Sequence, residues 1–323
     1  MPNNHLIAEL CQNHKGSISL LKEMIFAAKE SGIKYLKIQD IKSEELTHRT
    51  RFDKGLVQNK KILVIKRPFK DELLRLKNLD LPDKFIDIFI EETIKAKIYP
   101  IVTPFTYSSL ERIVNKKFKF IKIASYDCSA FPFIQEVSFL NKKLIVSTGA
   151  TKLNEIKKTV NFLKKKKKLA ALLHCVSIYP TPMNKCNINK IRLLKKLFSN
   201  IKVGWSDHTR FEDCGNAPAL ASIIAGGSFI ERHFTIIKKD KTKDGPISIN
   251  PNEAKTLLNL INKKKSIILD YLNQNYKNWK LCLGKGNHGL THEELLNRDY
   301  YRGRFASLVD GKYNYNWETK KNS

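Results

Sequence analysis

The chain has 323 residues, 42% of them hydrophobic, and a formal net charge of +28. This length can bury a large core in one big domain or two modest ones. No apolar run approaches the roughly 18 residues that span a bilayer, and the amino-terminal MPNNHLIAEL lacks the pattern of a secretory signal. Six cysteines without a C-x-x-C pair indicate reduced thiols and a cytoplasmic protein rather than a disulfide frame or a zinc-thiolate site.

The positive charge has two interpretations. A basic protein can bind nucleic acid or an anionic membrane, but here Lys and Arg are spread along the whole chain and aromatic residues are not interleaved with them. The densest run, Lys164–Lys168, closes an amphipathic helix, where lysines complement the helix dipole. We therefore expect no nucleic-acid or membrane partner, and an attraction for small anionic substrates.

Short apolar runs alternate with helical patterns along the chain. The predicted strands are 5–10, 35–38, 98–102, 120–124, 143–146 and 169–174, with two more beginning at 201 and 229. The predicted helices are 17–31, 68–78, 82–96, one from 108, 131–140, one from 151 or 154, 188–199, 213–225 and 250–272. The stretch 41–66 is polar with little periodicity, so it is predicted to be a long functional or mobile loop.

Eight strand–helix units between His5 and Leu272 fit the usual span of about 250 residues for an α/β fold of the (β/α)8 TIM-barrel type. An open doubly wound sheet is the alternative, but the chain contains no G-x-G-x-x-G turn and no phosphate-binding P-loop. We predict a catalytic barrel over 1–275 and a short, linker-like extension with a polar tail over 276–323.

Two of the predicted strands end in similar segments, IKVGWSDHT at 201–209 and FIERHFT at 229–235. If these strands are neighbours, His208 and His233 lie at the same end of the sheet with Asp207 and Glu231 beside them. Such a group is half of a shell for a divalent metal. The alternative is that each histidine is a polar residue hydrogen-bonded at a strand end.

The carboxyl ends of all barrel strands meet at one mouth, where TIM-barrel enzymes carry their chemistry. Lys37 and Lys122, with a ring of hydroxyls, could bind phosphate and carboxylate groups there. Strand alternation equally allows both lysines to face the outer helices. The other candidates at strand ends are Glu9, Gln39, Thr103, Ser125, Asp127, Ser147, Ser177 and Ser206.

The chain resembles the N-acetylneuraminate (sialic acid) synthase family, also called nonulosonate synthases. The matching segments occur in order over about 5–250: IAELCQNHKGS, YLKIQ, VTPF, IKIAS, STGAT, LLHCVSIYPTP, VGWSDHT and ERHFT. The resemblance implies condensation of phosphoenolpyruvate with the open-chain aldehyde of an N-acylated amino sugar, with release of phosphate by C–O cleavage, for a surface polysaccharide. It also implies a homodimer.

The same resemblance assigns roles to individual residues. It implies Mn²⁺ or Mg²⁺ on His208 and His233, and phosphoenolpyruvate contacts at Lys37, Thr103, Lys122, Ser125, Ser147 and Ser206. Glu9, Ser177, Tyr179 and Asp207 would line the sugar side or support the metal. Asp127, Glu9 and Lys122 are the predicted catalytic residues.

The chain departs from the family at three places. Asp127 stands where sialate-forming members have a glutamate. Asp244 precedes Gly245-Pro246, whereas the family reads G-P-D, and Asp244 is the candidate to replace the sugar contact of that family aspartate. The family also carries a small antifreeze-like domain after the barrel, and 276–323 fits no complete domain of that kind. Arg298, Arg302 and Arg304 are interpreted as surface or dimer contacts rather than anchors for sugar or phosphate.

Two other functions are compatible with these residues. One is a metal-dependent aldolase or lyase that works on the same barrel without phosphoenolpyruvate. The other is a non-enzymatic basic module that binds nucleic acid or an anionic glycan.

Overall fold

A closed barrel of parallel strands forms the centre of the molecule, which we describe from a computed structural model over residues 4–321. Of the predicted regions 1–275 and 276–323, residues 1–3 and 322–323 lie outside the described range. The barrel strands are β1 (His5–Glu9), β2 (Tyr35–Asp40), β5 (Tyr99–Pro104), β6 (Phe120–Ile123), β7 (Lys143–Ser147), β8 (Leu169–Cys175), β9 (Lys202–Asp207) and β10 (Phe229–Phe234). Each pairs with the next, and β1 pairs with β10, so the predicted TIM barrel is confirmed.

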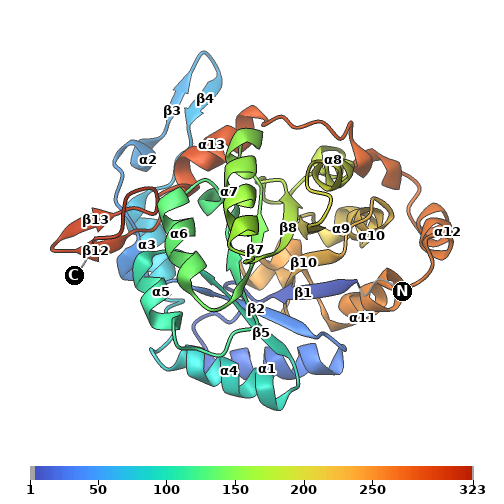
Figure 1. Ribbon diagram of the computed structural model, residues 1–323, viewed down its shortest axis with the longest axis horizontal. Helices are drawn as coiled ribbons and strands as arrows, with labels where there is room; N and C mark the ends of the chain where they lie inside the picture. The colour runs from blue at the N-terminus through green and yellow to red at the C-terminus, as the bar shows by residue number, and fades with distance from the viewer. Residues whose placement is uncertain (1–3, 322–323) are drawn as a thin grey trace.

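Helices surround this barrel (Figure 1). They are α1 (Ile18–Glu30), α3 (Phe69–Lys77), α4 (Phe85–Lys95), α5 (Tyr107–Ile113), α6 (Phe131–Phe139), α7 (Leu153–Lys165), α8 (Lys190–Leu197), α9 (Phe211–Cys214), α10 (Ala217–Ile224), α11 (Pro251–Ile261) and α12 (Lys265–Asn275). Ser17 caps α1 by accepting a hydrogen bond from the Leu20 N–H at 3.2 Å. The predicted helix 250–272 is wrong as a single element, because the chain turns at 262–264 between α11 and α12. None of the helices in residues 4–321 is both long and apolar enough to cross a membrane.

The inside of the barrel changes from apolar to polar along each strand. Ile7, Ile101, Ile145 and Phe229 belong to a buried cluster inside the barrel. Inward-facing residues recur at every second position of a strand, so the next inward positions are Glu9, Thr103, Ser147 and Glu231. The apolar layer therefore forms a floor, and the polar layer above it faces the mouth.

The segment 41–66 has more structure than its sequence indicates. It contains the short helix α2 (Arg51–Lys54) and a hairpin of β3 (Leu56–Gln58) and β4 (Lys61–Val64), which projects from the top of Figure 1. Asn59 and Lys60 turn the hairpin with φ of 49° and 61°. Phe52 of α2 is buried, with its ring 5.1 Å from that of Tyr300. The predicted loop is thus partly ordered by distant contacts.

The chain after α12 runs back over the barrel. From α12 at the right of Figure 1 it crosses the top to α13 (His292–Tyr301) and ends in a hairpin of β12 (Ser307–Val309) and β13 (Lys312–Asn314) at the left. The Thr47 N–H donates to the Arg304 carbonyl, and the Ala306 N–H to the Glu45 carbonyl, each at 3.0 Å. Residues 310–321 were expected to be a polar tail, but Asn314 and Asn316 are buried.

Candidate active site

A cavity of about 510 Å³ opens at the carboxyl ends of the barrel strands. The structure brings most of the predicted site residues to its wall: Glu9, Lys37, Gln39, Thr103, Lys122, Ser125, Asp127, Ser147, Tyr179, Ser206, His208, His233 and Asp244. Ser177 and Asp207 are buried and do not line it.

Two buried lysines meet around one carboxylate at the base of this cavity. The Nζ atoms of Lys37 and Lys122 lie 3.8 Å and 3.6 Å from the Glu231 Oε1. Lys37 also contacts the Glu9 carboxylate and donates to the Thr103 hydroxyl at 3.2 Å. Both lysines are at most 3% exposed, so they face into the barrel and the alternative of an outward orientation is excluded.

Burial and mutual repulsion set the ionisation of this group. Burial lowers the pKa of Lys37 to about 7, and the neighbouring Lys122 charge acts in the same direction, whereas Glu231 opposes them. For Glu231 burial favours the neutral acid, but Lys122 and Lys37 hold its pKa below the ordinary value. The ammonium groups of Lys37 and Lys122 thus lie beside two carboxylates, Glu231 and Glu9, at the base of the cavity.

Hydroxyl groups surround these lysines. The Ser206 Oγ donates to the Glu231 Oε1 at 3.1 Å, and the Gly149 N–H donates to the Ser125 Oγ at 3.2 Å. The Ser147 Oγ is buried and has no hydrogen-bond partner within residues 4–321. A buried polar atom without a partner costs about 1–3 kcal/mol, so this hydroxyl is available to a ligand oxygen.

The two histidines at the ends of β9 and β10 also meet in the cavity. Ser206 pairs with Glu231 and Asp207 with Arg232, which places His208 beside His233. Their ring centroids are 5.5 Å apart. Burial lowers the pKa of both imidazoles below their ordinary value, so both rings are neutral near pH 7 and their nitrogen lone pairs are available as ligands.

Asp207 holds the segment that carries His208 from outside the cavity. Its carboxylate is paired with the guanidinium of Arg232 and accepts hydrogen bonds from the Thr209 N–H and hydroxyl at 2.9 Å and 2.7 Å. Strand alternation turns Asp207 away from the cavity and its neighbours Ser206 and His208 toward it. Ser177 is likewise enclosed, behind Gly149, where a Cβ would come within 2.5 Å of its Oγ.

Asp127 is the buried acid of the opposite wall. Burial raises its pKa to about 7, although the Asn316 side chain opposes this by donating a hydrogen bond of 2.8 Å to Oδ1. A carboxyl group with a pKa near 7 can exchange protons at physiological pH. Asn316 comes from the C-terminal extension, so the extension influences the chemistry of a strand-end residue.

The extension also forms part of the cavity wall, through Glu293, Leu296, Asn297, Tyr301, Arg304 and Phe305. Arg304 is buried and ion-paired with Glu72, and Arg298 pairs with Glu155 at 2.6 Å. The prediction that Arg304 lies at the surface is therefore wrong, whereas a dimer contact of Arg298 or Arg304 stays a prediction. Arg302 lies with its guanidinium 5.4 Å from the Trp317 ring.

Several residues of the cavity were not selected from the sequence. Cys11 lies two residues after Glu9, so continued strand alternation would have indicated it. Glu231 was noted only beside the histidines, not as the carboxylate between the lysines. Tyr301 and Arg304 carry no motif, because their position depends on contacts with residues far along the chain.

These features define a TIM barrel with two buried lysines and a histidine pair at its mouth. Residues 24–270 match the model of the NeuB family. The chain is 34% identical to the N,N'-diacetyllegionaminic acid synthase of Campylobacter jejuni over 262 residues, which are 80% of this chain and 75% of that one. It is 29% identical to a pseudaminic acid synthase of the same species over 308 residues, 94% of this chain and 81% of the relative.

A solved structure agrees with these relatives. The N-acetylneuraminic acid (sialic acid) synthetase of Leptospira borgpetersenii, crystallised with citrate, superposes with a TM-score of 0.70 and 26% identity, covering 85% of this chain and 93% of that one. The chain therefore belongs to the NeuB family, and the predicted family is confirmed. Its relatives with assigned names include synthases of legionaminic, pseudaminic and sialic acids.

Proposed function

We propose that this protein condenses phosphoenolpyruvate with the open-chain aldehyde of an N-acylated amino sugar or a related aldose. The products would be a nonulosonate-type keto acid and inorganic phosphate, for a surface polysaccharide. The observation that carries the proposal is the pair of buried lysines, Lys37 and Lys122, on either side of Glu231 at the base of a cavity that also contains His208 and His233. The names of the relatives support it.

The lysine end of the cavity suits the phosphate and carboxylate of phosphoenolpyruvate. Lys37 and Lys122 supply positive charge, and Thr103, Ser125, Ser147 and Ser206 supply hydroxyl donors. Preorganised donors in a site shielded from water bind such anions without further reorganisation. The ligand would thereby fix the enol carbon C3 toward the histidine end.

His208 and His233 fit the divalent metal, Mn²⁺ or Mg²⁺, that the family resemblance implies. Both rings are neutral and buried, and the His233 Nδ1 has no hydrogen-bond partner in the part of the chain that the structure describes. A metal bound here would supply Lewis-acid polarisation of the acceptor's aldehyde. Asp207 would keep His208 in position through the turn that it caps.

The condensation would form a bond from C3 of phosphoenolpyruvate to the aldehyde carbon, leaving positive charge at C2. Water would then add to C2, and phosphate would leave with the bridging oxygen. One proton of that water would pass to the alkoxide formed from the aldehyde and the other would leave with the phosphate, which balances the reaction. Asp127, as the carboxylate, would stabilise the positive C2 and accept the proton of the incoming water. Lys122 would hold the phosphate end and its charge during departure, and the Glu9 carboxylate would keep the Lys37 ammonium in place beside it.

The acceptor sugar would occupy the upper part of the cavity. Gln39, Tyr179 and Asp244 line it from the barrel, and Asn297 and Tyr301 line it from the extension. Amide, phenol and carboxyl groups offer both donors and acceptors for sugar hydroxyls and an N-acyl group. These residues would therefore decide which sugar is used.

The test is phosphate release by the purified protein with Mn²⁺, phosphoenolpyruvate and a panel of N-acyl hexosamines and their 6-deoxy relatives. The proposal expects phosphate and keto acid in equal amounts, with both substrates required. No phosphate with any acceptor would refute it. Cleavage or condensation with pyruvate in place of phosphoenolpyruvate would favour the aldolase or lyase, and salt-sensitive oligonucleotide binding without turnover would favour the basic module.

The proposal includes a homodimer in the cytoplasm. Light scattering of the purified protein tests the first part, since a monomer mass at micromolar concentration would contradict it. Fractionation of the source cells tests the second.

A further inference from the structure

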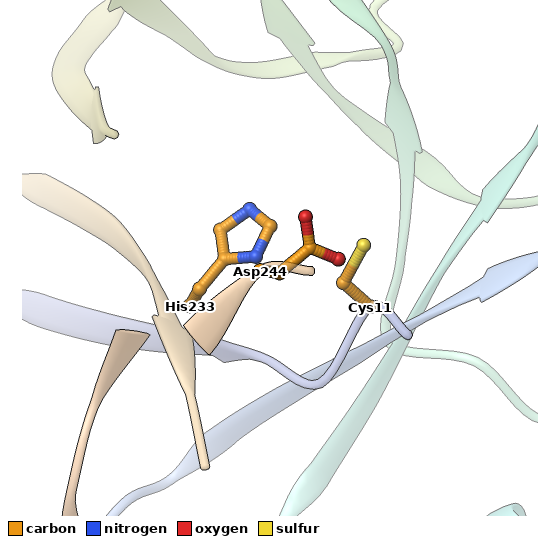
Figure 2. A group of neighbouring side chains, drawn as sticks. All are labelled: Cys11, His233 and Asp244. Atoms are coloured by element: carbon orange, nitrogen blue, oxygen red, sulfur yellow. The ribbon is translucent and has the colours of Figure 1, made fainter. Parts of the chain in front are cut away.

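Three potential metal ligands from separate segments meet at one edge of the cavity. Cys11 follows β1, His233 lies in β10, and Asp244 precedes the turn at Gly245–Ile247. One ligand atom from each lies within 4.8 Å of the others. Figure 2 shows the thiol, the carboxylate and the imidazole directed toward one another. An ion with ligand distances of about 2.0–2.3 Å needs only a small closure of this group.

Two of these side chains have buried atoms without hydrogen-bond partners. The His233 Nδ1 and the Asp244 Oδ2 are both unpartnered within residues 4–321, and His233 is only 7% exposed. Most buried polar atoms in proteins have a partner, because an unpaired one costs about 1–3 kcal/mol. A cation bound between these side chains would satisfy both atoms at once.

The backbone at Cys11 is held in an unusual conformation that directs its thiol to this place. Its φ is 43°, in the left-handed region that costs a residue other than glycine roughly 1–2 kcal/mol. The Cys11 N–H donates to the Glu9 Oε1 at 2.8 Å. The Asn13 side chain fastens the same loop to the Phe234 carbonyl at 2.8 Å and the Ser248 hydroxyl at 3.0 Å. The loop is thus tied directly to the end of β10.

We propose that Cys11, His233 and Asp244 together form a mixed sulfur, nitrogen and oxygen site for a borderline-soft divalent cation such as Zn²⁺, Fe²⁺ or Co²⁺. This inference deepens the proposed function by adding ligands to the metal assigned to His208 and His233, with His233 common to both sets. A thiolate ligand selects against Mg²⁺, which prefers oxygen. The metal of this chain would therefore differ from the Mg²⁺ that the family resemblance allows.

A second cysteine allows a matched control. The Cys175 Sγ lies 3.7 Å from the His208 Nδ1, on the other side of the histidine pair. It is also buried and is also a free thiol. If sulfur ligation at this cavity came from the His208 side, Cys175 rather than Cys11 would supply it.

The experiment is a Co²⁺ titration of the metal-free full-length protein, followed by the near-ultraviolet charge-transfer band that a thiolate–Co²⁺ bond produces. The wild type and Cys175→Ser should show the band. Cys11→Ser should lose it and bind Co²⁺ at least about 10–100-fold more weakly, since even outer-shell partners of a metal contribute that much. Asp244→Asn should weaken binding and keep the band, and excess Mg²⁺ should not displace Co²⁺.

Cys11→Gly separates metal binding from folding. Glycine adopts positive φ without the steric cost, so this variant should unfold at the wild-type temperature or above while lacking the band. A wild-type protein without the band, a band that survives Cys11→Ser, or a band lost in Cys175→Ser would overturn the inference.

The metal site and the proposed function can fail separately. If the wild type releases phosphate with Mn²⁺ but shows no thiolate–Co²⁺ band, the sulfur site alone is refuted. If it shows the band but releases no phosphate with any acceptor, the proposed synthase alone is refuted.

Discussion

The two sides of the cavity wall are held in different ways. On the barrel side, Lys37 and Lys122 are at most 3% exposed and stand on strands that are hydrogen-bonded on both edges. On the other side, Tyr301 and Asn297 belong to α13, a partly exposed helix. That helix is held by polar contacts, such as the Asn297 side chain donating to the Ser177 carbonyl at 2.7 Å, and by aromatic contacts, such as the Tyr300 ring against Phe52.

This difference suits a cavity in which the two sides bind different substrates of the proposed reaction. A rigid, buried, charged group suits a ligand that never changes, which is phosphoenolpyruvate in the proposed reaction. A surface helix is easier to alter, and it faces the place proposed for the acceptor sugar. The relatives are named for different sugar acids, as expected if acceptor choice lies in the side that is easier to alter. Four substitutions test this comparison.

Lys122→Met should have the largest effect. It removes one of the two buried ammonium groups from the anion end and should lower the rate of phosphate release by about 10²–10³-fold, as for loss of one preorganised donor. Lys119→Met, an exposed lysine just before β6, is the matched control and should retain full activity. Equal effects of the two substitutions would mean that charge acts over the whole surface and not within the cavity.

Asp127→Asn should lower the rate by about 10²-fold, the usual contribution of a proton-transfer group. Burial raises the pKa of Asp127 to about 7 and lowers that of Lys37 to about 7, and the active forms are the Asp127 carboxylate and the Lys37 ammonium. The kcat/KM of the wild type should therefore rise with pH on the acid side of 7, as Asp127 loses its proton, and fall on the alkaline side, as Lys37 loses its charge. The Asp127→Asn variant should show the fall without the rise. A rise that persists in Asp127→Asn would contradict this role of the carboxylate.

Tyr301→Ala should affect the acceptor alone. Its ring lines the cavity from α13, and its loss should raise KM for the sugar by about tenfold, or about 1.4 kcal/mol, with KM for phosphoenolpyruvate nearly unchanged. Leu295→Ala, at 43% exposed on the same helix, controls for helix stability. A rise in KM for phosphoenolpyruvate would remove the proposed division between the two sides.

Asn316→Ala should have the smallest effect, on pH dependence. The Asn316 amide stabilises the Asp127 carboxylate by its 2.8 Å hydrogen bond, so its removal should raise the pKa of Asp127 further. The rise in kcat/KM should then move to higher pH by up to about one unit. An unchanged midpoint would mean that Asp127 does not govern the profile.

Much of the barrel side was predictable because it follows from local geometry. Once β1 and β10 are known to be strands, Glu9 and Glu231 must face inward two positions beyond Ile7 and Phe229. The same alternation explains why Ser206 and His208 line the cavity while Asp207 turns to Arg232. The choice of inward or outward face for Lys37 and Lys122, and the position of Glu231 between them, needed the structure.

The extension could not be predicted in this way. Arg304 is fixed by Glu72, 232 residues earlier in the chain, and Asn316 by Asp127, 189 residues earlier. Such contacts leave no periodicity or spacing within the extension itself. The break between α11 and α12 was missed for a related reason, since apolar residues continue at helical spacing on both sides of it while the chain turns at 262–264.

The most direct test of the proposed reaction is the fate of the bridging oxygen of phosphoenolpyruvate. The protein would be incubated with phosphoenolpyruvate labelled with oxygen-18 at that position, together with Mn²⁺ and an accepted N-acyl amino sugar. The oxygen-18 content of the phosphate and of the keto acid would then be measured by mass spectrometry. C–O cleavage predicts that the label leaves with phosphate and that the keto acid carries an oxygen from water at C2. Label retained in the keto acid would contradict the account.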